Sequence, residues 1–234
     1  MPEHFHPEDQ LVYAIRGVMT VRTIQGTWVV PAQRAVWIPA RVPHRISMSG
    51  PVSMRTLYFR RGMVRRLPRN CRVVNVSPLL RELLLHACKT REMTRRSRSQ
   101  AHLIDFVVDQ LETVEVVPLQ LPSPSDPRAM RVADAISREP GDDRPLAGIC
   151  RNAGASKRTI ERLFQVETGM TLGEWRQQAR LMRSLEMLAA GEKITHVALE
   201  SGYGTPSAFI SMFRRMLGTT PGRYFETSPD GLVA

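Results

Sequence analysis

The chain has 234 residues, 42% of them hydrophobic, a formal net charge of +11 and three cysteines. This composition excludes an intrinsically disordered chain. No apolar run reaches the ~20 residues of a membrane-spanning helix, and the first residues lack the pattern of a secretory signal. Because Cys71, Cys88 and Cys150 are odd in number and lack zinc-finger spacing, we expect buried thiols in a cytoplasmic protein without a membrane partner.

The first predicted elements are short strands between residues 10 and 59. Apolar and polar residues alternate in these runs, and turn signals such as Arg16-Gly17 and Gly50-Pro51 separate them. Short strands at this spacing are typical of an antiparallel barrel or sandwich. The expected strands are Gln10–Ile15, Val18–Ile24, Thr27–Val30, Ala35–Ile38 and Val52–Phe59.

Two leucine-rich helices are predicted next, within residues 78–115. Ser77 is expected to cap the first of them, with Pro78 at its first helical position. Their apolar faces either pack on the barrel as core or form a dimer contact, and both interpretations stay open. Residues 116–127 then hold four prolines and are expected to form a semi-rigid linker.

The C-terminal region contains one short unit twice, in residues 146–164 and 194–213. Each unit has an apolar–small pair, a glycine at a turn and a hydroxyl residue that caps a second helix. These are the parts of a helix-turn-helix, whose second helix enters the major groove of DNA. The residues concerned are Ile149, Cys150, Gly154 and Ser156 in the first unit, and Val197, Ala198, Gly202 and Thr205 in the second.

A long helix is predicted between the two units. Thr171 and Glu174 form a capping box at its start, and Gly191 marks its end. Its ~17 residues span roughly 26 Å. This length could hold two recognition helices near the ~34 Å that separates successive major-groove faces on one side of DNA.

Taken in this order, residues 126–225 resemble the DNA-binding domain of the AraC/XylS family of bacterial transcription regulators. The resemblance implies a regulator that binds double-stranded promoter DNA through helices near 156–165 and 205–216, with RNA polymerase as a further candidate partner. The matching stretches are Ser156–Phe164, Thr168–Leu172, Arg180–Arg183, Val197–Tyr203 and Phe209–Gly222.

The resemblance also implies that Lys157, Arg158 and Arg162 face the major groove. Arg158 and Arg162 are four residues apart and so share one helix face, and an arginine that reaches guanine contributes ~1–3 kcal/mol of base discrimination. The corresponding Ser207 and Ser211 are short and neutral, so we expect the first unit to specify sequence and the second to hold register. For any single arginine, a solvated surface is the alternative interpretation. The other expected DNA contacts are Ser156, Thr159, Thr205, Arg214 and Arg215.

The positive charge of the chain does not follow the helix-turn-helix region. Residues 1–122 hold 18 Lys+Arg and 9 Asp+Glu, a net of +9, whereas residues 123–234 hold 15 and 13, a net of +2. Net charge alone would assign DNA binding to the N-terminal half. The assignment to the C-terminal region therefore depends on where the individual basic residues stand.

The N-terminal segments from His4 to Gln10 and from Pro31 to His44 resemble the two motifs of the cupin barrel. In metal-binding cupins the matching positions are metal ligands, which implies a site for Ni, Zn or Fe formed by His4, His6, Gln10 and His44. The alternative interpretation is an effector pocket that these histidines line without a metal.

The predicted fold class is α+β with two domains. Residues 1–115 are expected to form a cupin-like antiparallel β-barrel with helices, for sensing and dimerisation, and residues 128–234 an all-α double helix-turn-helix domain. The function expected is a homodimeric transcription regulator that responds to a small-molecule or metal effector. A metal-dependent cupin enzyme is the alternative, and the lack of a carboxylate at Gln10 and of an acid/base pair beside the histidines favours the regulator.

Overall fold

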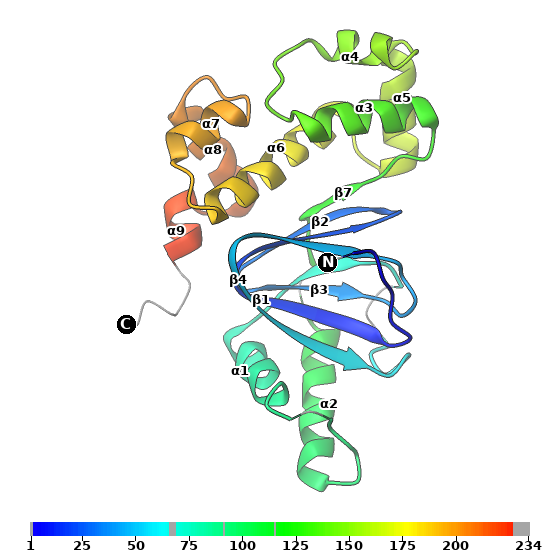
Figure 1. The fold of residues 1–234 in the computed structure, drawn as a ribbon, viewed down its shortest axis with the longest axis vertical. Coiled ribbons are helices and arrows are strands. Elements are labelled where there is room, and N and C mark those ends of the chain that lie inside the picture. Colours follow the sequence, from blue (N-terminus) through cyan, green and yellow to red (C-terminus); the bar gives the residue numbers. More distant parts are fainter. Residues whose placement is uncertain (1, 66–68, 91, 115, 227–234) are drawn as a thin grey trace. The chain divides into compact units, whose positions relative to one another are not determined.

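The computed structural model describes residues 2–65, 69–90, 92–114 and 116–226 (Figure 1). The chain divides into two units. The N-terminal unit comprises Met1–Thr23 and Trp28–Leu119, and the C-terminal unit comprises Ile24–Thr27 and Gln120–Ala234. Within the described ranges, no helix combines the length and the apolar character that crossing a membrane requires.

The N-terminal unit is an antiparallel β-barrel with helices, which confirms the predicted fold class. Its strands are β1 (Asp9–Thr23), β2 (Gly26–Pro31, whose first two residues belong to the C-terminal unit), β3 (Arg34–Ile38), β4 (Arg45–Phe59), β5 (Arg72–Asn75) and β6 (Val116–Val117). The sheet order runs β6-β5-β3-β1-β2, and β4 pairs with β1. β1 is the central strand, because its first half pairs with β3 while nearly its whole length pairs with β4.

β1 and β4 are both longer than the sequence predicts. The expected turn at Arg16-Gly17 is a bulge inside β1, with register shifts against β4 on both sides of Arg16. Gly17 (φ +80°) and Gly50 (φ +69°) take left-handed conformations, which let each strand bend without ending. A Cβ on Gly17 would lie 2.5 Å from the Pro51 carbonyl oxygen, so the two bends also pack against each other.

The two helices of the N-terminal unit are α1 (Pro78–Ala87) and α2 (Arg98–Glu112), and Figure 1 shows them together on one side of the sheet. Ser77 caps α1 as predicted, since its Oγ accepts a hydrogen bond from the backbone N–H of Leu80 at 3.1 Å. One face of each helix is core, while Leu79 and Phe106 are 49% and 43% exposed. The buried cluster comprises Leu11, Tyr13, Ala35, Trp37, Phe59, Val64, Val74, Val76, Leu80, Leu84, Val107 and Leu111.

The C-terminal unit is helical and contains both predicted helix-turn-helix units. Its helices are α3 (Pro127–Arg138), α4 (Leu146–Asn152), α5 (Lys157–Thr168), α6 (Leu172–Ala189), α7 (Ile194–Glu200), α8 (Pro206–Leu217) and α9 (Pro221–Glu226). Figure 1 shows α6 running between the α4–α5 pair and the α7–α8 pair. Thr171 and Glu174 form the predicted capping box of α6, and the hydrogen bonds from Thr171 lower the pKa of the Glu174 carboxyl group.

The segment expected to be a linker contains two short strands and the first residue of α3. β6 pairs with β5, and a further short strand, β7 (Gln120–Pro122), belongs to the C-terminal unit. The indole Nε1 of Trp175 in α6 donates a hydrogen bond to the Pro122 carbonyl oxygen at 2.9 Å. Proline is compatible with short strands at sheet edges, because the missing N–H needs no partner there.

Candidate nucleic-acid interface and histidine cluster

The first helix-turn-helix unit consists of α4, a tight turn and α5. Ile149 and Cys150 of α4 are buried, and Gly154 takes the left-handed conformation (φ +81°) that the turn requires. Ser156 caps α5, because its Oγ accepts a hydrogen bond from the Thr159 backbone N–H at 3.2 Å. Arg131 of α3, which the sequence did not single out, donates from Nη2 to the Ala153 carbonyl oxygen at 2.8 Å and so fixes the end of α4.

The outer face of α5 carries three exposed basic side chains, Lys157, Arg158 and Arg162. Lys157 is already engaged within the helix, since its Nζ lies 3.3 Å from Oε1 of Glu161. Within the described part of the chain, Arg158 and Arg162 form neither a hydrogen bond nor an ion pair through their side chains. Two guanidinium groups on one helix face therefore point to solvent with all their donors available.

The inner face of α5 holds this surface in place. Ile160 and Phe164 are fully buried, and Leu163 nearly so. The Phe164 ring meets the Trp175 ring of α6 edge to face, with centroids 5.5 Å apart. The orientation of the exposed arginines thus depends on the packing between α5 and α6.

The second unit repeats this construction with a different outer face. Thr205 caps α8 by accepting a hydrogen bond from the Ala208 N–H at 3.2 Å, and Pro206 follows at the first helical position. Ser207 and Ser211 are exposed on α8, where the first unit carries arginines. Arg214 and Arg215 are exposed in the last turn of the helix.

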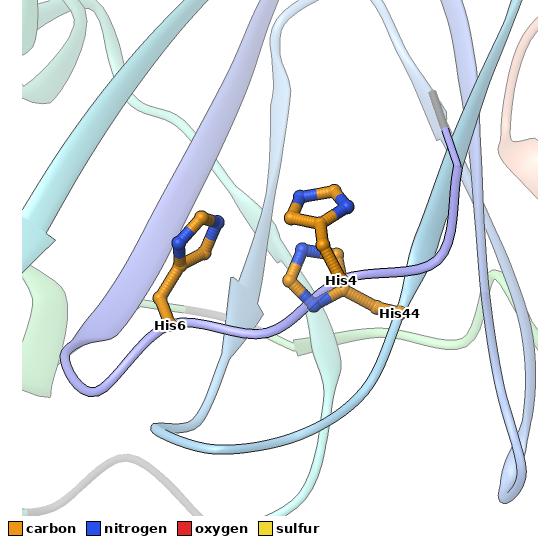
Figure 2. Close-up of side chains that lie close together, drawn as sticks. All are labelled: His4, His6 and His44. Atoms are coloured by element: carbon orange, nitrogen blue, oxygen red, sulfur yellow. The ribbon is translucent and has the colours of Figure 1, made fainter.

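The histidine cluster lies in the N-terminal unit, where the segment before β1 meets the segment before β4 (Figure 2). His4 and His44 are joined by two backbone hydrogen bonds, of 3.0 and 2.8 Å. Their ring centroids are 4.5 Å apart, and the His6 ring lies 5.0 Å from His4 and 5.6 Å from His44. One nitrogen from each imidazole lies within 4.8 Å of the others.

Hydrogen bonds set the tautomers of two of these rings. The Nδ1 of His4 donates to the Pro2 carbonyl oxygen and the Nδ1 of His44 donates to the Val42 carbonyl oxygen, both at 2.8 Å. Because a carbonyl oxygen only accepts, each Nδ1 carries the proton and each Nε2 presents a lone pair. Burial lowers the pKa of His44 and of His6. The neighbouring His4 lowers the pKa of both further, and His6 also lowers the pKa of His44.

Three buried polar atoms in this region have no hydrogen-bond partner: His6 Nε2, His44 Nε2 and Gln10 Oε1. Gln10 reaches the cluster through Tyr58, because its amide nitrogen lies 3.4 Å from the Tyr58 hydroxyl and the Tyr58 ring lies 4.9 Å from His6. Buried polar atoms are nearly always paired, so these three atoms, two of them on imidazoles of one cluster, indicate a site for a further group that bonds to them.

A cavity of about 740 Å³ lies beside the cluster, between β4 and the helices α1 and α2. Its floor includes apolar side chains of the core, among them Phe59, Ile104 and Val107, and His6 and Tyr58 line it as well. Cys88, whose thiol pKa is raised by burial, stands in its wall. The volume is in the range of pockets that hold small organic ligands.

Two known families and several known proteins are similar to this chain. Residues 1–121 match the family described as an AraC-like ligand binding domain, and residues 149–227 match a helix-turn-helix domain. The HTH-type transcriptional regulator NimR of Escherichia coli (strain K12) is 33% identical over 95% of this chain and 81% of its own length. RipA of Corynebacterium diphtheriae, also an HTH-type transcriptional regulator, is 32% identical over 48% of this chain and 32% of its own. The structure of ToxT from Vibrio cholerae with bound unsaturated fatty acid matches with a TM-score of 0.44 and 14% identity, over 99% of this chain and 91% of ToxT.

Proposed function

Because the chain belongs to the AraC family of helix-turn-helix transcription regulators, we propose that it reads specific DNA sequences mainly through α5. The observation that carries this proposal is the pair of unengaged guanidinium groups, Arg158 and Arg162, on the exposed face of a capped and packed helix. A guanidinium with free donors can bind both acceptors of a guanine edge at once. In this proposal Lys157 faces the major groove beside the two arginines, and Ser156 and Thr159 at the start of α5 contact the DNA as well.

The second unit has a positioning role in this proposal. Ser207 and Ser211 of α8 are short and accept or donate with little discrimination between bases. Thr205, Arg214 and Arg215 at the two ends of α8 contact the phosphate backbone. Sequence is thus read by one helix while the other fixes register, and residues 128–234 form the DNA-binding domain.

The test is a titration of the full chain against DNA from upstream of its own gene and against random DNA, at several salt concentrations. We expect a preference for the specific site of ~10³-fold or more, together with a decline of affinity as salt rises. Equal affinity for both DNAs at every salt concentration would contradict the proposal. The basic N-terminal half would then be the source of non-specific binding.

The N-terminal unit is the sensor in this proposal and does not catalyse a reaction. Residues 1–115 bind a small-molecule or metal effector, the small molecule in the cavity beside β4, and pair two copies of the chain through α1 and α2. Leu79 and Phe106 are exposed apolar residues on these helices that suit such a contact. DNA-bound dimers then act on transcription in the cytoplasm through contact with RNA polymerase.

A first-row divalent metal fits the histidine cluster. His4, His6 and His44 would hold it through nitrogen lone pairs, and the carbonyls of Pro2 and Val42 orient the His4 and His44 rings by accepting hydrogen bonds from their Nδ1 atoms. The Gln10 amide oxygen, buried and unpaired, would be the fourth ligand. Three imidazoles and one oxygen suit Ni, Zn or Fe, and the ion when bound supplies a Lewis-acidic centre.

Substitutions at Gln10 and His44 test the metal. We expect Gln10→Glu to bind Zn²⁺ or Ni²⁺ more tightly than the natural chain, because a carboxylate is a stronger ligand than an amide. Metal-free Gln10→Glu should be less stable than the natural chain, because a carboxylate costs more to bury than an amide. His44→Ala should reduce the affinity for the metal ion by more than the ~10–100-fold that is lost when a residue hydrogen-bonded to a metal ligand is removed.

Calorimetric titration and metal-dependent thermal unfolding measure both effects. His102→Ala, at an exposed histidine of α2, is the matched control and should bind metal as the natural chain does. If neither ion raises the unfolding temperature of the natural chain, the cluster is a metal-free part of the effector pocket.

A further inference from the structure

Arg180 lies in α6, and its guanidinium group contacts both the loop that precedes the first helix-turn-helix unit and the turn of the second unit. Its Nε donates a hydrogen bond to the Pro140 carbonyl oxygen at 2.8 Å, and its Nη2 donates to the Asp142 carbonyl oxygen at 3.3 Å. Its Nη1 donates to the Gly202 carbonyl oxygen at 3.4 Å, and its Cζ lies 5.7 Å from the centroid of the Tyr203 ring. The first two acceptors lie in the loop that leads into α4, and the other two partners in the turn between α7 and α8.

The same loop and turn also meet directly through their backbones. A Cβ on Gly141 would lie 2.1 Å from the Glu200 carbonyl oxygen and 3.2 Å from the Gly202 nitrogen. A Cβ on Gly202, which has φ +76°, would lie 2.7 Å from the Gly141 carbonyl oxygen. Only glycine at both positions permits this approach, so the contact between the two regions is close and specific.

The loop presents its carbonyls in a fixed arrangement. Asp142 accepts a hydrogen bond from the Arg144 backbone N–H at 2.9 Å and pairs with its guanidinium at 2.6 Å, which lowers the pKa of the Asp142 carboxyl group. Arg176, one turn before Arg180, donates from Nη1 to the Arg144 carbonyl oxygen at 3.3 Å. Two arginines of α6 therefore hold the loop from one side.

We infer that Arg180 is a positioning residue that fixes the angle between the two helix-turn-helix units and thereby the spacing of the DNA segments they read. A planar guanidinium holds three donors in one fixed plane, so three carbonyls from two regions are locked to a single side chain. Without it, α6, the contact of Arg176 with the loop and the close approach of Gly141 to Gly202 still join these parts, but no guanidinium group bonds to both the loop and the turn. This inference rests on the proposed function and adds a selection on DNA spacing to it.

The test compares the affinity of the protein for two DNAs: one in which the two contacted segments have their natural spacing, and one with a base pair inserted between them. The natural chain first selects its preferred site from a random-sequence library, and a footprint locates the two contacted segments. One base pair is then inserted between them, which moves the second segment by ~3.4 Å and turns it by about 35°. Affinities for both DNAs are measured for the natural chain, Arg180→Met, Arg180→Lys and Gly141→Ala. Arg183→Met is the control, because Arg183 is half-exposed on the same helix and pairs only with Glu186 among the described residues.

We expect the insertion to weaken binding by the natural chain and by Arg183→Met at least about tenfold, and by Arg180→Met no more than about threefold. Arg180→Lys should lie between these, because an ammonium group cannot reproduce the planar donor set. Gly141→Ala should also reduce the dependence of affinity on spacing, because its methyl group pushes the loop away from the turn. It replaces Arg180→Met as the test variant if Arg180→Met does not fold.

The ratio of the affinities for the natural and the lengthened DNA distinguishes a role of Arg180 in positioning the two units from a role in the stability of the fold. A role in stability alone would weaken binding to both DNAs equally in every variant, and that result would overturn the inference. A natural chain that selects no site would overturn the proposed function as well. A natural chain that selects a site but tolerates the insertion would overturn the inference alone.

Discussion

We expect Arg158→Ala and Arg162→Ala each to weaken binding to the specific DNA by ~1–3 kcal/mol, which is roughly 5- to 150-fold. The reason is that each guanidinium is exposed, unengaged within the described residues and carried on the recognition face of α5. The loss should be largest for the natural site and smaller for sites already altered at the contacted base pair. Fluorescence anisotropy against the selected site and single-base variants of it measures both effects.

Arg22→Ala is the matched control for these two substitutions. Arg22 is an exposed arginine of β1, so its removal takes away the same charge from the N-terminal unit. If bulk positive charge were the source of affinity, this variant would lose as much as the α5 variants. Equal losses for all three arginines, with no change in base preference, would show that α5 is not the reader.

We expect Phe164→Ala to lower the free energy of unfolding by ~3–5 kcal/mol. Phe164 is fully buried and packs edge to face on Trp175, so its removal leaves a cavity between α5 and α6. Val166, on the same helix but 73% exposed, provides the control, and Val166→Ala should change stability by no more than ~0.5 kcal/mol. Urea unfolding followed by circular dichroism measures both variants.

The Phe164 experiment also concerns function. Because α6 holds α5 through this ring pair, the variant should bind specific DNA more weakly even at temperatures where it is folded. A Phe164→Ala chain with natural stability would mean that α5 and α6 are joined by other contacts than the structure indicates.

Local chemistry made the helical elements predictable. The caps at Ser77, Ser156, Thr171 and Thr205 involve a side chain and a backbone N–H three residues away, so the sequence contains both partners. The two helix-turn-helix units follow from the same local rules and from their repetition. Which face of α5 is exposed follows from the spacing of its apolar residues.

Features that depend on distant partners were not predictable in the same way. Arg16-Gly17 reads as a turn, yet it is a bulge, because β4 continues alongside it and keeps the strand paired. The proline-rich segment reads as a linker, yet it contains β6 and β7, and its Pro122 carbonyl accepts a hydrogen bond from Trp175 of α6. The sequence placed Arg180 in a stretch that resembles the family but predicted no contact for its side chain. Its three acceptors lie 22 to 40 residues away along the chain, so only the folded structure brings them together.

The histidine cluster lies between these two cases. The resemblance to cupins named His4, His6 and His44, and the structure brings their nitrogens together. The orphaned acceptors and the tautomers set by the Pro2 and Val42 carbonyls could be seen only in three dimensions. Whether the cluster binds a metal ion can be tested by calorimetric titration.

The pairing of β4 with β1 has a consequence for how the chain avoids self-association while it folds. Among the described residues β4 has no second strand partner, so one edge of a 15-residue strand is open, and open edges template stacking between chains. Gly50 and Pro51 interrupt this edge with a left-handed bend and a residue that has no N–H, and Arg45 and Arg55 place exposed charge on either side. We therefore expect the exposed charges of Arg45 and Arg55 to oppose the addition of newly made chains to this edge, because like charges on two such edges repel each other.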